Sequence, residues 1–122
     1  MGLSAGSDLR PTIENARSIH FVGICGTAMA SVAAALKERG ITVSGSDQGI
    51  YPPMSTFLEE RGIAAKPFGA ANLAHKPDLV VIGNAISRGN PEAEFALEQK
   101  LDYCSLPELL KHQFLRWDAS RV

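Results

Sequence analysis

A short apolar run that ends in a glycine-rich bend and then becomes helical is the feature that most constrains this sequence. Residues 19–22 (IHFV) are typical of a buried strand. Gly23 and Gly26 then bend the chain, and from Thr27 onward apolar side chains recur at helical spacing. Such a unit directs backbone N–H groups and the positive end of a helix dipole at one point in space. It therefore predicts an anion site, most often for a phosphate, within an α/β fold.

The alternation of strands and helices continues along the chain. We expect strands over residues 19–22, 41–45, 63–68, 79–82 and 103–104, and helices over 27–39, 54–61, 91–100 and 107–117. This alternation predicts a Rossmann-like α/β fold, a five-stranded parallel sheet in the order 3-2-1-4-5 with helices on both faces. In that order the first and fourth strands are neighbours, so the segments that follow them, residues 23–29 and 83–88, should meet at one crevice.

Composition argues against several classes of function. A net charge of -1 over 122 residues does not favour a nucleic-acid partner. No stretch approaches the roughly 18 apolar residues of a membrane span, and no signal-peptide layout begins the chain. Cys25 and Cys104 do not form a C-x-x-C pair, so we expect two free thiols in a reducing cytoplasm. The histidines (His20, His75 and His112) lack metal-ligand spacing, and we expect no metal site.

The glycine bend departs from the dinucleotide-binding fingerprint. When G-x-G-x-x-G is laid on Gly23, Cys25 takes the second glycine position and Ala28 the third. A cysteine there narrows the approach of a pyrophosphate to the backbone, although Gly26 can supply room one residue later. A bend that only shapes the chain is the alternative. Asp47, an acid 21 residues after Gly26, favours the anion site.

Polar residues follow the second and fourth strands. Asp47 is placed to accept hydrogen bonds from ribose hydroxyls, or else to cap its own turn. Asn84 and Ser87 can donate and accept hydrogen bonds, and Arg88 can either bind a diphosphate or remain a solvated charge. Asn90-Pro91 has the form of a helix N-cap followed by proline at the first helical position.

Catalytic chemistry is not indicated. Cys25 lies near a helix start, where the dipole should lower the pKa of a thiol, but no partner base is implied. The sequence contains no G-x-x-x-x-G-K-[ST] P-loop, no acid/base pair and no nucleophile triad. We expect a binding domain in which no residue is catalytic.

Four segments in register resemble the N-terminal domain of the Mur ligases, over about residues 19–117. They are GICGTAM at 23–29, GSD at 45–47, YPPMS at 51–55 and GNAISRGNP at 83–91. Within the family, the third segment and the end of the fourth resemble members that join UDP-N-acetylmuramate to L-alanyl-γ-D-glutamyl-meso-diaminopimelate in cell-wall recycling. Members that add L-alanine instead are one alternative; an NAD-binding Rossmann domain and a plain interaction module are the others.

The resemblance implies that this chain is one part of an ATP-dependent, amide-forming ligase and is inactive alone. Residues 1–18, which are small, polar and aperiodic, would be a flexible leader, 19–117 the UDP-sugar-binding domain, and 118–122 the start of a linker to an absent ATPase domain. ATP and magnesium would belong to that central domain, and the peptide to a C-terminal one. The residues implied to bind UDP-N-acetylmuramate are Gly23, Ile24, Cys25, Gly26, Thr27, Ala28, Met29, Ser46, Asp47, Asn84, Ala85, Ser87 and Arg88.

Overall fold

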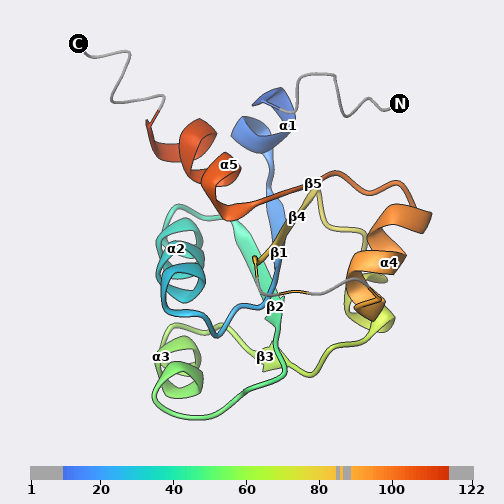
Figure 1. Ribbon diagram of the computed structural model, residues 1–122. Coiled ribbons are helices and arrows are strands. Elements are labelled where there is room, and N and C mark those ends of the chain that lie inside the picture. The colour runs from blue at the N-terminus through green and yellow to red at the C-terminus, as the bar shows by residue number, and fades with distance from the viewer. Residues whose placement is uncertain (1–9, 85, 87–88, 116–122) are drawn as a thin grey trace.

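A single parallel sheet forms the centre of the computed structural model, which describes residues 10–84, 86 and 89–115, with side chains to 113. The strand order is β3-β2-β1-β4-β5, with every neighbouring pair parallel (Figure 1). This confirms the predicted fold class and order. The strands are β1 (Ser18–Val22), β2 (Thr42–Ser46), β3 (Ala65–Lys66), β4 (Leu79–Ile82) and β5 (Tyr103–Cys104).

Except for α1, which was not predicted, the helices lie close to their predicted places. They are α1 (Arg10–Asn15), α2 (Thr27–Glu38), α3 (Met54–Glu60), the 3₁₀ turn η1 (Ala70–Leu73), α4 (Pro91–Glu98), α5 (Leu106–Leu110) and the π-helical turn η2 (Lys111–Leu115). The side chain of Asn90 accepts hydrogen bonds from the N–H groups of Glu92 and Ala93, which confirms the predicted N-cap. The strand expected over residues 63–68 is shorter than predicted, because Pro67 has no N–H to extend the ladder.

The start of the described chain corrects one expectation. The aperiodic leader predicted for residues 1–18 does not hold from residue 10 onward, because residues 10–15 form α1 and Ser18 already belongs to β1. Ile13 on α1 is fully buried, and its carbonyl accepts a 2.6 Å hydrogen bond from the Gln113 side chain. This segment is therefore part of the fold, held by a contact 100 residues away in sequence. Residues 1–9 lie outside the described part.

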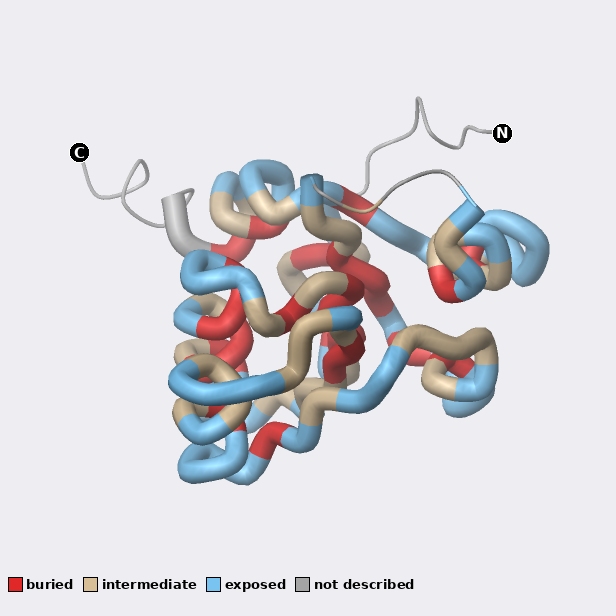
Figure 2. The backbone as a smooth tube through the Cα atoms, turned by 60° about the horizontal axis from the view of Figure 1, so that its bottom comes forward, coloured by how far each residue is buried: buried red, intermediate tan, exposed pale blue. Residues whose placement is uncertain are grey.

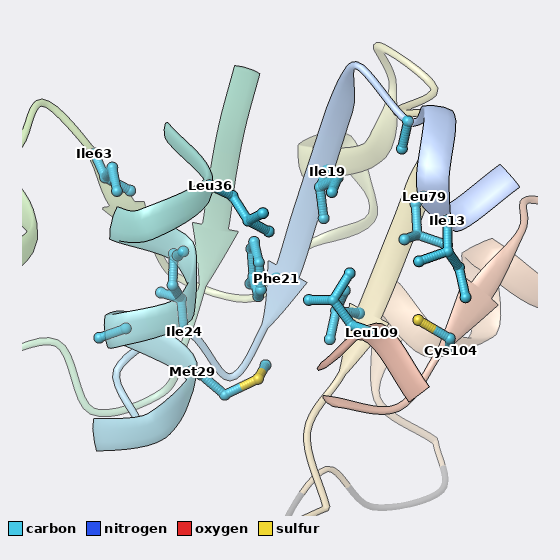
Figure 3. Close-up of a cluster of buried hydrophobic side chains, with 14 of the residues drawn as sticks. Ile13, Ile19, Phe21, Ile24, Met29, Leu36, Ile63, Leu79, Cys104 and Leu109 are labelled. Carbon is cyan, nitrogen blue, oxygen red and sulfur yellow. The ribbon is translucent and has the colours of Figure 1, made fainter. Parts of the chain in front are cut away.

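Helices cover both faces of the sheet. The larger buried cluster lies between one face and α1, α2, α3 and α5, and includes Ile19, Phe21 and Leu109 (Figure 3). A smaller cluster, which contains Val22 and Val80, packs under α4 and η1 on the other face. Buried residues follow the strands and the inner sides of the helices (Figure 2). Side chains alternate between faces along each strand, so adjacent residues of β1 contact different helices. No described helix has the length and hydropathy that a bilayer crossing requires.

Candidate functional site

A cleft of about 820 Å³ opens where β1, β2 and β4 end. Its volume falls within the range of small-molecule sites, roughly 300–1,000 Å³. The strand order produces this position, because open parallel sheets leave a crevice where the connections diverge to opposite faces. The described residues that line it are Gly23, Cys25, Gly26, Met29, Asp47, Gln48, Gly49, Tyr51, Pro53, Met54, Phe68, Gly83, Asn84, Ile86 and Asn90.

The glycine bend forms one wall of the cleft. Gly23 has a φ of +95°, which a residue with a side chain rarely adopts. Gly26 precedes α2 with extended backbone, and no side chain caps this helix end. Both Gly26 and Met29, in the first turn of α2, line the cleft. The amino end of a twelve-residue helix therefore meets the cavity without a side-chain acceptor, an arrangement suited to an anion.

The segment after β4 meets the glycine bend, as the strand order predicted. The N–H of Gly83 donates to the carbonyl of Val22 at 3.0 Å. The side chain of Ile86 comes within 3.4 Å of where a β-carbon on Gly23 would lie. Two segments 60 residues apart in the sequence thus contact each other at one end of the sheet.

Asp47 joins the glycine bend to the loop after β2. One carboxylate oxygen accepts the N–H of Cys25 at 2.9 Å, and the other accepts the N–H groups of Gln48 and Gly49 at 2.7 and 3.0 Å. The turn-capping alternative for Asp47 is therefore present in the structure. A carboxylate has about four acceptor positions, so one remains for a ligand hydroxyl.

Ser46 contributes to the site through its backbone. Its carbonyl accepts the N–H groups of Gly23 and Ile24 at 2.8 and 2.9 Å, which fixes the bend to the end of β2. Its side chain is fully buried and donates to Glu92 at 2.6 Å. Glu92, on the first turn of α4, is equally buried. Burial raises the pKa of Glu92, but hydrogen bonds from His20, Ser46, Asn72 and the Gly69 N–H outweigh it, and the net pKa lies below its ordinary value.

The predicted site residues divide into three groups. Gly23, Cys25, Gly26, Met29, Asp47 and Asn84 line the cleft together. Ile24, Thr27, Ala28 and Ser46 are not among the lining residues; Ile24 is buried in the core, and Thr27 and Ala28 are exposed on α2. Ala85, Ser87 and Arg88 lie outside the described residues.

The sequence did not indicate that two aromatic side chains line the cleft. Tyr51, with 68% of its surface exposed, and Phe68 both line the cleft. The segment that contains Tyr51 was visible as a motif, but nothing in its pattern gave it a place at the cavity. Phe68 follows Pro67 in an edge segment, where sequence pattern does not predict which side chain turns toward a ligand.

The pKa of the Cys25 thiol differs from the sequence-based expectation. Burial raises the pKa of the Cys25 thiol, and the nearby Asp47 carboxylate raises it further, so the predicted lowering by the helix dipole is wrong. Burial, with Glu108 adding to it, raises the pKa of Cys104 to about 12. Both cysteines are free.

We predict slow alkylation of both thiols. A raised pKa leaves less thiolate at a given pH, so Cys25 should react with iodoacetamide more slowly than free cysteine at pH 8, and faster as the pH rises. Cys104 should stay unlabelled until the protein unfolds. Peptide-resolved mass spectrometry over time measures both rates, with urea-unfolded protein as the control. A Cys25 rate above that of free cysteine would mean that the helix dipole dominates.

The chain is similar to known proteins of one family. A model of the "Mur ligase family, catalytic domain" matches residues 18–117. The UDP-N-acetylmuramate–L-alanyl-gamma-D-glutamyl-meso-2,6-diaminoheptandioate ligase of Haemophilus influenzae is 50% identical over 101 residues, which cover 82% of this chain and 22% of the relative. The Escherichia coli enzyme of the same description is 48% identical, over 81% of this chain and 22% of the relative.

Solved structures agree. A murein peptide ligase from Psychrobacter arcticus has a TM-score of 0.77 and 46% identity, over 82% of this chain and 21% of that chain. Shikimate dehydrogenase from Aquifex aeolicus, at 16% identity and a TM-score of 0.54, covers 88% of this chain and 50% of that one, and shares the fold alone.

Sheet order and cleft position define a Rossmann-like α/β domain with a ligand crevice at the point where its connections diverge. Over residues 18–117 the chain belongs to the Mur ligase family, and it is homologous to the N-terminal part of the murein peptide ligases. It spans about a fifth of the length of the curated relatives it matches, 22% in the first two.

Proposed function

We propose that this chain binds UDP-N-acetylmuramate as the N-terminal domain of a ligase that joins this nucleotide sugar to L-alanyl-γ-D-glutamyl-meso-diaminopimelate in the cytoplasm. The observation that carries the proposal is the convergence of the glycine bend, Asp47 and the start of the 83–91 segment on one cleft, in a member of the Mur ligase family. The substrate named in the descriptions of the relatives at 48–50% identity supports this choice over L-alanine ligases, which are up to 36% identical among the relatives compared.

Several groups of the ligand have suitable partners in the cleft. The diphosphate would accept hydrogen bonds from the N–H groups at the uncapped start of α2. A ribose hydroxyl would donate to the remaining acceptor position of Asp47. Asn84, exposed at the cleft, can donate and accept, and so suits a sugar or a base edge.

We infer that the bond-forming step needs protein outside these 122 residues. The sequence has no P-loop, and the described residues include no group of three or more His, Cys, Asp or Glu side chains that could hold a metal ion. The residues that the structure describes therefore do not fit ATP with magnesium. In a complete ligase they would bind the nucleotide sugar and leave activation of its carboxylate to other domains.

Calorimetric titration of the 122-residue chain tests the proposal. We expect UDP-N-acetylmuramate to bind and NADH to give no heat above dilution. Incubation with the nucleotide sugar, ATP, magnesium and tripeptide should yield no amide product. Binding of NADH alone would favour a dehydrogenase-type domain instead. Failure of both ligands to bind would show that the cleft does not hold a nucleotide without the other domains of the ligase.

A further inference from the structure

The proposed nucleotide contacts leave one buried charged group without a role. The Glu92 carboxylate lies at 0% exposure in the first turn of α4, beneath the sheet face that carries His20 and Ser46. A carboxylate is costly to bury unless hydrogen-bond donors surround it. Here donors do surround it, and they come from several segments of the chain.

Four groups donate to this carboxylate. One oxygen accepts from His20 Nε2 at 2.7 Å and from the Ser46 hydroxyl at 2.6 Å. The other accepts from the Gly69 N–H at 3.0 Å and from the Asn72 amide at 2.7 Å. An ionised carboxylate is the only side-chain group that can accept from all four without donating in return.

Two of these four contacts, those of Ser46 and Gly69, lead to walls of the cleft. Ser46, through its carbonyl, holds the N–H groups of Gly23 and Ile24 in the glycine bend. Gly69 directly follows Phe68, which lines the cleft. Asn90, which also lines the cleft, caps the helix on which Glu92 lies by accepting the N–H of that same residue.

We propose that Glu92 is a positioning residue for the nucleotide cleft: it holds the Phe68–Gly69 segment and the start of α4 at a fixed distance from the glycine bend. The inference rests on the proposed function for its ligand. Glu92 does not line the cleft itself, so it acts through Ser46, Gly69 and Asn72.

The Glu92→Gln variant separates the effect of the Glu92 charge from the effect of its side-chain size. A glutamine at position 92 has nearly the same shape, but its NH₂ group would face two donors wherever it points. Two of the four donors would then lose their acceptor, and the segments that carry them would shift. The matched control is Glu94, an exposed acid in the same first turn of α4. Glu94→Gln removes the same charge from the same helix end and leaves the four contacts intact.

Affinity for UDP-N-acetylmuramate is the first readout, taken at a temperature where circular dichroism shows each variant fully folded. We expect Glu92→Gln to weaken binding by about tenfold or more, and Glu94→Gln to stay within about twofold of the parent. A role confined to stability would lower the melting temperature and leave the affinity of the folded protein unchanged. Equal affinities in the two variants would overturn the proposal.

Asn72→Ala covers the case in which Glu92→Gln does not fold. Asn72 is half-buried, and its replacement by alanine removes a single donor from the Glu92 carboxylate. The variant should therefore fold and bind UDP-N-acetylmuramate about threefold more weakly. Unchanged affinity in Asn72→Ala would then overturn the proposal.

Amide NMR without ligand keeps this inference distinct from the proposed function. In Glu92→Gln, or in Asn72→Ala where the first variant does not fold, the Phe68, Gly69 and Asn90 amide resonances should shift and the Gly69 N–H should exchange faster with solvent. Glu94→Gln should leave them in place. If the parent chain fails to bind UDP-N-acetylmuramate but these shifts appear, the proposed ligand is wrong and the positioning role stands. If the parent binds and the shifts are absent, the positioning role is wrong.

Discussion

Replacement of Gly45 by alanine will destabilise the domain by about 2–3 kcal/mol, the usual range for forcing extra volume into a packed core. A β-carbon on Gly45 would overlap the Ile24 side chain, with its Cβ at 2.6 Å and its Cγ1 at 2.9 Å. The Cβ of Ile24 is bonded to its backbone, so a change of rotamer cannot remove the overlap. The bend itself would have to move away from β2, where Ser46 holds it. Urea denaturation should show the loss of unfolding free energy directly. Thermal denaturation should give a melting temperature about 10 °C lower.

Gly69→Ala is the matched control for this effect. Gly69 has an extended backbone, φ 177°, and a β-carbon there would meet no atom within 4 Å. The same added methyl group should therefore change stability by less than about 0.5 kcal/mol, or raise it slightly by restricting the unfolded chain. If Gly45→Ala were as stable as Gly69→Ala, close packing of the glycine bend on β2 would not constrain the fold.

The sheet could be predicted because its signals are local. Residues 79–82 are apolar at every position, and Pro91 and Gly40 mark helix ends at the places where helices begin and end. Once the order of strands is known, the meeting of the glycine bend with Gly83 follows from geometry. The helix α1 was missed because six residues form a helix only with tertiary support, and that support comes from Gln113 at the other end of the chain.

The part of the site that could not be predicted depends on side-chain pairs distant in sequence. Glu92 has the sequence features of an ordinary acid that favours a helix start, and Ser46 those of a pocket residue. Their hydrogen bond joins positions 46 residues apart and turns the serine away from the cleft. The pKa of Cys25 was mispredicted for a similar reason. The helix-dipole rule is local, whereas burial and the Asp47 carboxylate are set by the fold.

Replacement of Gly26 by valine should abolish binding of UDP-N-acetylmuramate and leave a folded domain. The backbone at Gly26, φ -64° and ψ 144°, suits any residue, and a β-carbon would make only ordinary contacts, 3.6 Å from the Gly23 carbonyl oxygen and 3.8 Å from the Met29 side chain. Loss of a favourable N-cap glycine should cost at most about 1 kcal/mol. The side chain would, however, occupy the cleft wall at the start of α2.

The expected loss of affinity is large because the diphosphate would give up charge-assisted hydrogen bonds. Two such bonds, at about 1.5–3 kcal/mol each, correspond to a rise in the dissociation constant of at least about 100-fold. Calorimetry measures this, with circular dichroism to verify folding. Ser31→Val, an exposed position one turn further along α2, adds a similar apolar side chain outside the cleft lining and should bind as the parent does. Undiminished affinity in a folded Gly26→Val would place the diphosphate away from the glycine bend, because a ligand held by N–H groups at the start of α2 cannot share that space with two methyl groups.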